Sequence, residues 1–102
     1  AIARAASAAL DSVVLATGHG ADVLAGGRRA VRLRVDAPAL ARVVGGGDAL
    51  SALVAAFVAR GSDAFVATEA AHAAFAAAAR AAGDRGPGSF WPAFLDALAA
   101  HG

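Results

Sequence analysis

A short, purely apolar run followed at once by a glycine turn is the feature that most restricts the fold of this chain. Residues 13–16 read Val-Val-Leu-Ala, and Thr17 and Gly18 follow directly. Because the run has no polar face, it predicts a strand buried on both faces, as in a parallel sheet covered by helices. The pattern therefore favours a layered α/β protein.

A hairpin is predicted after this strand. Residues 22–25 are mostly apolar, Gly26 and Gly27 suit a tight turn, and apolar and charged residues alternate over 30–35. Alternation with a period of two is typical of a strand with one face in solvent. We interpret three arginines as the solvent-facing residues of the hairpin, namely Arg28, Arg32 and Arg34.

Helices are predicted on both sides of these strands. Residues 1–10 are rich in alanine, the best helix former, and read as the tail of a helix. The clearest helix opens at the segment 45–48 and ends at Arg60 and Gly61, where Gly61 is expected in left-handed backbone. Its apolar face has helical spacing and consists of Leu50, Leu53, Val54, Phe57 and Val58.

Two further helices follow. Ser62 or Asp63 is expected to cap one that runs to Gly83, and Ser89 is expected to cap the last. The apolar face of the last helix is predicted to hold Trp91, Phe94, Leu95 and Leu98. One buried strand and a hairpin followed by three helices predict an α/β fold, and the pattern looks like one flank of a larger layered fold.

Composition excludes several classes of function. The chain has no Cys, which removes disulfides and thiolate chemistry. The formal net charge of +1 gives no electrostatic footprint for nucleic acid or an anionic membrane, and no apolar run reaches the roughly 18 residues of a membrane span. The chain opens at Ala1 without a signal-peptide pattern, so we expect a cytoplasmic protein represented by its C-terminal part.

The segment Gly45-Gly46-Gly47-Asp48 carries the main chemical signal. Consecutive glycines before a helix expose unpaired backbone N–H groups, and the helix dipole adds partial positive charge, which together suit a phosphoryl group. A carboxylate at the first helical position can take a proton from a hydroxyl lying beside that site. On these four residues alone the simpler interpretation is favoured, in which Asp48 is an N-cap after a flexible loop.

The histidines and the tryptophan receive structural interpretations. Glu69 and His72 form an E-x-x-H pair, but a di-iron site needs more carboxylates, so no metal site is predicted within this chain. His19 is interpreted as an exposed turn residue, and Trp91 as part of the core or of a subunit interface.

Taken together, these motifs resemble the C-terminal part of ribokinase-like kinases, which have a three-layer α/β/α fold. The strand closing at Thr17 and Gly18, the hairpin and the segment Val-Val-Gly-x-Gly-Asp-Ala-Leu-Ser-Ala are shared with that group. The ending Gly-Pro-Gly-Ser-Phe at 86–90, followed by Phe-Leu-Asp-Ala-Leu at 94–98, resembles hydroxyethylthiazole kinase in particular. The resemblance covers residues 1–102 as the C-terminal fragment of a single kinase domain.

The resemblance implies roles for individual residues. Thr17 is similar to the family's nucleotide-contacting threonine and Gly45 to the glycine that touches the thiazole substrate. The backbone N–H groups of Gly45, Gly46 and Gly47 form the anion hole. Asp48 stands at the position of the catalytic residue, often Cys in this branch and Asp across the wider fold. Gly46 replaces the Thr that is usual in this branch.

The implied function is ATP-dependent phosphorylation of 4-methyl-5-(2-hydroxyethyl)thiazole in thiamine biosynthesis, with Mg²⁺ as cofactor. The full-length protein that contains this chain is implied to be a homotrimer. The fragment alone is expected to be inactive. Two alternatives stay open. One is another enzyme of the same fold, namely a hydroxymethylpyrimidine or sugar kinase or the related hydrate dehydratase. The other is an inactive truncated module that only packs or oligomerises.

Overall fold

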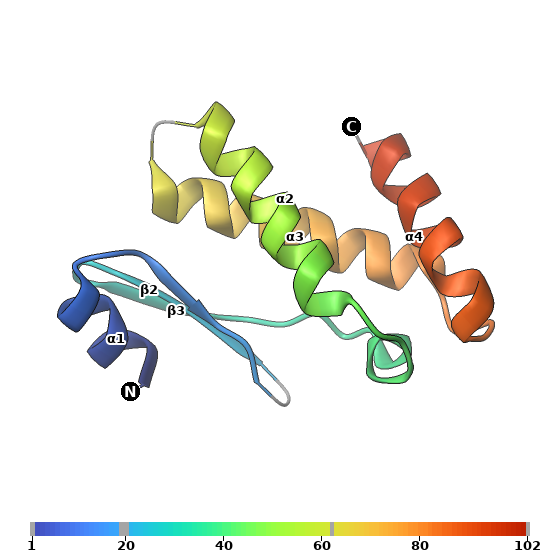
Figure 1. Cartoon of the computed structure of the whole chain (residues 1–102), viewed down its shortest axis with the longest axis horizontal. Coiled ribbons are helices and arrows are strands. Elements are labelled where there is room, and N and C mark those ends of the chain that lie inside the picture. The colour runs from blue at the N-terminus through green and yellow to red at the C-terminus, as the bar shows by residue number, and fades with distance from the viewer. Residues whose placement is uncertain (1, 19–20, 62, 102) are drawn as a thin grey trace.

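The computed structural model describes residues 2–18, 21–61 and 63–101 (Figure 1). The helices are α1 (Ile2–Leu10), α2 (Gly46–Arg60), α3 (Ala64–Ala82) and α4 (Pro87–His101). The strands are β1 (Val14–Ala16), β2 (Asp22–Gly26) and β3 (Arg29–Leu33), and a short 3-10 helix, η1 (Pro38–Arg42), precedes α2. This order confirms the predicted α/β class and the predicted sequence of elements.

The sheet is antiparallel throughout and has β2 at its centre, in the order β1-β2-β3. Leu15 of β1 pairs with Leu24, which in turn pairs with Val31 of β3. The predicted first strand is therefore present, but its predicted burial on both faces of a parallel sheet is wrong. β1 is half-buried because it lies at the edge of the described sheet, whereas central Leu24 is completely buried.

The turn of the hairpin lies one residue later than predicted. Gly26 is still part of β2 and pairs with Arg29, so Gly27 and Arg28 form the turn. Gly27 has a φ of 58°, in the left-handed region that glycine adopts without steric cost.

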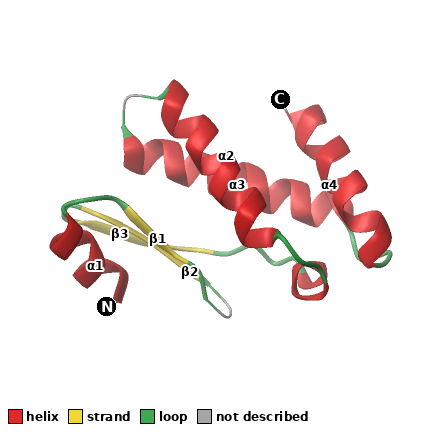
Figure 2. Ribbon diagram, in the orientation of Figure 1, coloured by secondary structure: helices red, strands yellow, loops and turns green. Residues whose placement is uncertain are grey.

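Helices lie on both sides of the sheet (Figures 1 and 2). On one side α1 contacts β1 and β2, and on the other α3 contacts β2. Helix α1 buries Ala3 and Ser7, and the Ser7 hydroxyl donates a 2.7 Å hydrogen bond to the carbonyl of Ser12. This bond fixes the chain where it leaves α1 and enters β1.

Helix α3 is buried along most of its length and contacts α2 and α4 as well as the sheet. It begins as predicted at Asp63, whose carboxylate accepts hydrogen bonds from the N–H groups of Phe65 and Val66, and it ends at Gly83, which has a positive φ of 72°. The other capping candidate, Ser62, lies outside the described residues. Small side chains let the neighbouring helices approach α3 closely, and its most deeply buried alanines are Ala71, Ala74, Ala76, Ala78, Ala79 and Ala82.

An aromatic cluster joins α3 to α4. The ring of Phe75 meets that of Phe94 edge-on, with centroids 5.5 Å apart, and Trp91 contacts both Phe90 and Phe94 in the same manner. Such edge-to-face pairs stabilise a core beyond the area that they bury. The prediction that Trp91 belongs to the core is consistent with this packing, although its side chain is only half-buried.

Three details of the predicted helices are wrong. α4 begins at Pro87, a residue favoured in the first turn, so Ser89 lies inside the helix and does not cap it. Leu95 is 59% exposed and is not among the residues that pack against the core cluster. Gly61 ends α2 with a φ of −101°, in extended rather than left-handed backbone.

The apolar face of α2 is only partly covered. Leu50 is buried, Leu53, Val54 and Phe57 are half-buried, and Val58 is exposed. In the part of the chain that the structure describes, no helix combines the length and the apolar character needed to cross a membrane.

The close packing of α3 predicts a contrast between two substitutions of the same kind. Ala78→Leu adds a large side chain at a position that is 2% exposed and should lower the free energy of unfolding by about 1–3 kcal/mol. Ala73→Leu makes the same change on the exposed side of α3 and should stay within about 0.5 kcal/mol of the unchanged protein. Denaturant unfolding of the full-length protein measures both values, and equal effects would contradict the described packing.

Candidate active site

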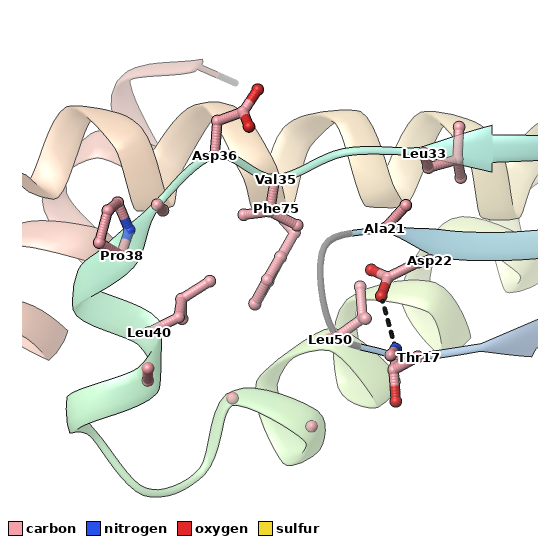
Figure 3. A pocket seen from close by; sticks show the side chains of 15 residues that line it. Thr17, Ala21, Asp22, Leu33, Val35, Asp36, Pro38, Leu40, Leu50 and Phe75 are labelled. Carbon is pink, nitrogen blue, oxygen red and sulfur yellow. Dashed lines mark hydrogen bonds between the residues drawn. The ribbon is translucent and has the colours of Figure 1, made fainter.

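A cavity of about 630 Å³ lies between the strand ends, the segment that leads to η1 and the start of α2 (Figure 3). Thr17 and Asp22 line it from the sheet side, Gly46 and Gly47 from α2, and Phe75 from α3. Most of the lining is apolar and a few polar groups interrupt it, which is the composition of small-molecule sites in general.

The wall opposite α2 is held in place by α3. The Arg80 guanidinium donates a 2.9 Å hydrogen bond to the carbonyl of Val35, which lines the cavity. Asp36 follows with a φ of 54°, a left-handed conformation that is uncommon outside glycine. Asp36 is a second carboxylate in the lining, and no local motif in the sequence marks it as such.

Helix α2 starts without a side-chain cap. Gly45 is the N-cap residue, with φ 102° and ψ 5°, and its carbonyl accepts the hydrogen bond of the Ala49 N–H at 2.9 Å. The next three N–H groups belong to Gly46, Gly47 and Asp48, and no side chain at the N-cap position caps them. These groups, together with the positive end of the helix dipole, can bind an anion at the cavity wall.

Asp48 is the third residue of α2, not the first as predicted, and it is also not the N-cap of the simpler interpretation. Its side chain is exposed and takes part in none of the hydrogen bonds or ion pairs found among the described residues. A carboxylate in the first helical turn interacts favourably with the dipole. Neither Asp48 nor Gly45 lines the cavity, so both lie beside it rather than in it.

Trp91 of α4 holds the glycine segment (Gly45 to Gly47) in place through a hydrogen bond to the residue before it. The indole Nε1–H donates a 3.0 Å hydrogen bond to the carbonyl of Val44. The ring also lies next to Gly45, since a Cβ built on that glycine would be 3.9 Å from its Cζ2 atom. Sequence analysis misses this role, because nothing local to Trp91 indicates a partner in a segment so far away along the chain.

Thr17 is exposed at the end of β1, and it lines the same cavity as Gly46 and Gly47. The structure therefore brings together the predicted nucleotide-contacting residue and two of the three predicted anion-binding glycines. His19, predicted to lie in the turn after Thr17, falls outside the described residues.

A buried pair beside Thr17 is a third feature that the sequence did not predict, after Asp36 and the bond from Trp91 to Val44. His72 of α3 is 2% exposed, and its Nε2 atom lies 2.7 Å from Oδ2 of Asp22. Glu69 is exposed on the same helix, so the E-x-x-H pair does not form a joint site. A signal was available in principle, since Asp22 opens an otherwise apolar strand and His72 interrupts a stretch of alanines.

Taken together, the fold and the cavity define an α/β domain with a candidate small-molecule site, whose lining includes Gly46 and Gly47 at the start of α2. Comparison with known families makes this more specific, because the model of the Hydroxyethylthiazole kinase family matches residues 1–101. The chain belongs to the hydroxyethylthiazole kinase family.

Individual relatives agree with this assignment. A hydroxyethylthiazole kinase of Limosilactobacillus fermentum (strain NBRC 3956 / LMG 18251) is 37% identical over 97 residues, which cover 95% of this chain and 38% of the relative. Hydroxyethylthiazole kinases of Salmonella newport (strain SL254) and Salmonella agona (strain SL483) are each 41% identical over 98 residues, covering 94% of this chain and 37% of the relative. The chain therefore spans less than two-fifths of the length of these curated relatives.

The backbone of the glycine segment predicts opposite effects for two Gly→Ala substitutions. Gly45→Ala places a side chain on left-handed backbone and should lower the free energy of unfolding by about 1–2 kcal/mol. Gly47→Ala should raise it by about 0.4–1 kcal/mol, because Gly47 is helical and a Cβ there meets no atom within 4 Å. Denaturant unfolding compares the two variants. Stabilisation by Gly45→Ala would show that the helix starts differently.

Proposed function

We propose that the protein containing this chain transfers the terminal phosphoryl group of ATP to the hydroxyl of 4-methyl-5-(2-hydroxyethyl)thiazole, a reaction of thiamine biosynthesis. One observation supports this most directly. In a chain of the hydroxyethylthiazole kinase family, a helix start made of Gly46 and Gly47 faces the same cavity as Thr17. The proposal includes a homotrimer with sites shared between subunits, as the sequence resemblance implies, and the cytoplasmic location expected from the sequence.

Each site residue has a defined part in the proposed reaction. Thr17 contacts the nucleotide, and Gly45 contacts the thiazole. The Asp48 carboxylate takes the hydroxyl proton while the alcohol oxygen bonds to the terminal phosphorus. The bond from phosphorus to the bridging oxygen breaks, and its electrons leave with ADP. The N–H groups of Gly46 and Gly47 donate hydrogen bonds to the transferring phosphoryl oxygens, so positioning and electrostatics supply most of the catalysis.

The residues that the structure describes do not form a preformed cage for a magnesium ion. In the ranges 2–18, 21–61 and 63–101 no group of three or more His, Asp or Glu side chains could hold a metal ion. Asp22 is occupied by His72 and Gly18, whereas Asp36 lines the cavity and Asp48 lies beside it. Mg²⁺ that enters with ATP is held mainly by phosphate oxygens and water and needs only one or two carboxylates, and Asp36 could supply one of them.

A substrate panel tests the proposal against the other enzymes of the same fold. The full-length protein is incubated with ATP and with the thiazole alcohol, hydroxymethylpyrimidine or a sugar, and ADP formation is measured. Only the thiazole alcohol should be phosphorylated. Turnover of the pyrimidine or the sugar without turnover of the thiazole alcohol would reject the proposal. The same assay on the isolated 102-residue chain should detect no turnover.

The base assignment predicts a selective loss of rate. Asp48→Asn removes the proton acceptor while keeping the size of the side chain, so kcat of the full-length protein should fall about 10²- to 10⁴-fold with small changes in KM. Asp96→Asn makes the same change at an exposed position of α4 and should leave kcat unaltered. Steady-state kinetics at saturating concentrations of both substrates measures kcat of the two variants. A loss of only a few-fold in the Asp48 variant would exclude its role as base.

A further inference from the structure

The buried Asp22–His72 pair lies directly behind the segment that carries Thr17. Asp22 is 8% exposed and uses both carboxylate oxygens. Oδ1 accepts a 3.2 Å hydrogen bond from the backbone N–H of Gly18, the residue that follows Thr17, and Oδ2 lies 2.7 Å from Nε2 of His72. Figure 3 shows the first of these bonds as the link between Asp22 and the chain at Thr17.

His72 provides a fixed point for this link. It is among the most completely buried side chains in the described structure, and its neighbours on α3, Ala71 and Phe75, belong to the core. Because α3 also contacts α2, α4 and β2, its position is set by the whole domain. A hydrogen bond from such a residue holds the Asp22 carboxylate in one orientation.

Packing alone does not account for a buried Asp22–His72 pair, because burying it costs more free energy than burying an apolar pair. Burying a carboxylate costs free energy unless it is hydrogen-bonded, and an apolar pair of similar size would fill the same space. What the polar pair adds is a directed contact to Gly18, which no apolar side chain can make.

We propose that Asp22 and His72 are positioning residues for the nucleotide. His72 orients Asp22, Asp22 holds the Gly18 N–H, and this contact keeps Thr17 at the cavity wall. The inference rests on the proposed function, because it assigns the effect to ATP. The thiazole alcohol and the chemical step do not depend on the pair.

Kinetics of the full-length protein test this chain of contacts. His72→Leu removes the hydrogen bond to Asp22 and should raise KM for ATP about tenfold, with kcat and the KM for the thiazole alcohol changed less than about twofold. His72→Gln keeps an N–H group in reach of Asp22 and should recover most of the affinity. Ser7→Ala, the control, removes another side-chain hydrogen bond whose partners do not line the cavity, and it should leave KM for ATP unchanged.

A double variant tests whether the effect passes through Thr17. Thr17→Val combined with His72→Leu should raise KM for ATP no more than the larger single effect, because both changes disrupt one contact. Multiplying effects would overturn the inference, as would equal losses in kcat and in both KM values. If His72→Leu does not fold, His72→Asn replaces it, since its shorter amide cannot reach Asp22.

Amide hydrogen exchange separates this inference from the proposed function. The Gly18 N–H should exchange about tenfold faster in His72→Leu than in the unchanged protein, and it should be slow again in His72→Gln. Unaltered exchange of the Gly18 N–H in His72→Leu would reject the positioning role of Asp22 and His72, whatever values of KM and kcat are measured. Faster exchange together with no effect of Thr17→Val on KM for ATP would instead reject the nucleotide assignment of Thr17.

Discussion

The close packing of helix α3 is the constraint on which the rest of the structure depends. Its alanine-rich surface lets α2 and α4 approach on one side and β2 on the other. Three of its residues also reach the cavity or its walls: Phe75 lines it, Arg80 holds Val35, and His72 holds Asp22. A chain with few large side chains thus builds both its core and its candidate site from one buried helix.

Much of the fold is predictable because its signals are local. Asp63 caps α3 from one end and Gly83 closes it at the other, and each signal acts within a single helical turn. The alternating strand and its glycine turn are local in the same sense. The starting point of α4 is wrong in the prediction because Pro87 at the first helical position is a stronger signal than the serine that follows it.

Strand pairing and side-chain partners are not local, and here prediction from the sequence stops. The apolar run at 13–16 indicates a strand but not its antiparallel pairing with β2 or its place at the edge of the described sheet. In the site, three consecutive glycines reveal the start of α2. The partners of the buried pair are 50 residues apart, however, and those of the Trp91–Val44 bond are 47 apart. No spacing rule joins such residues, because their meeting depends on how complete elements pack.

In the proposed reaction, the N–H groups at the start of α2 receive the terminal phosphoryl group of ATP. A crystal structure of the full-length protein with a non-hydrolysable ATP analogue measures this most directly. The terminal phosphate should lie within hydrogen-bond distance of the Gly46 and Gly47 N–H groups, with Thr17 against the nucleotide. A nucleotide bound elsewhere, with the start of α2 left free of phosphate, would contradict the proposed reaction.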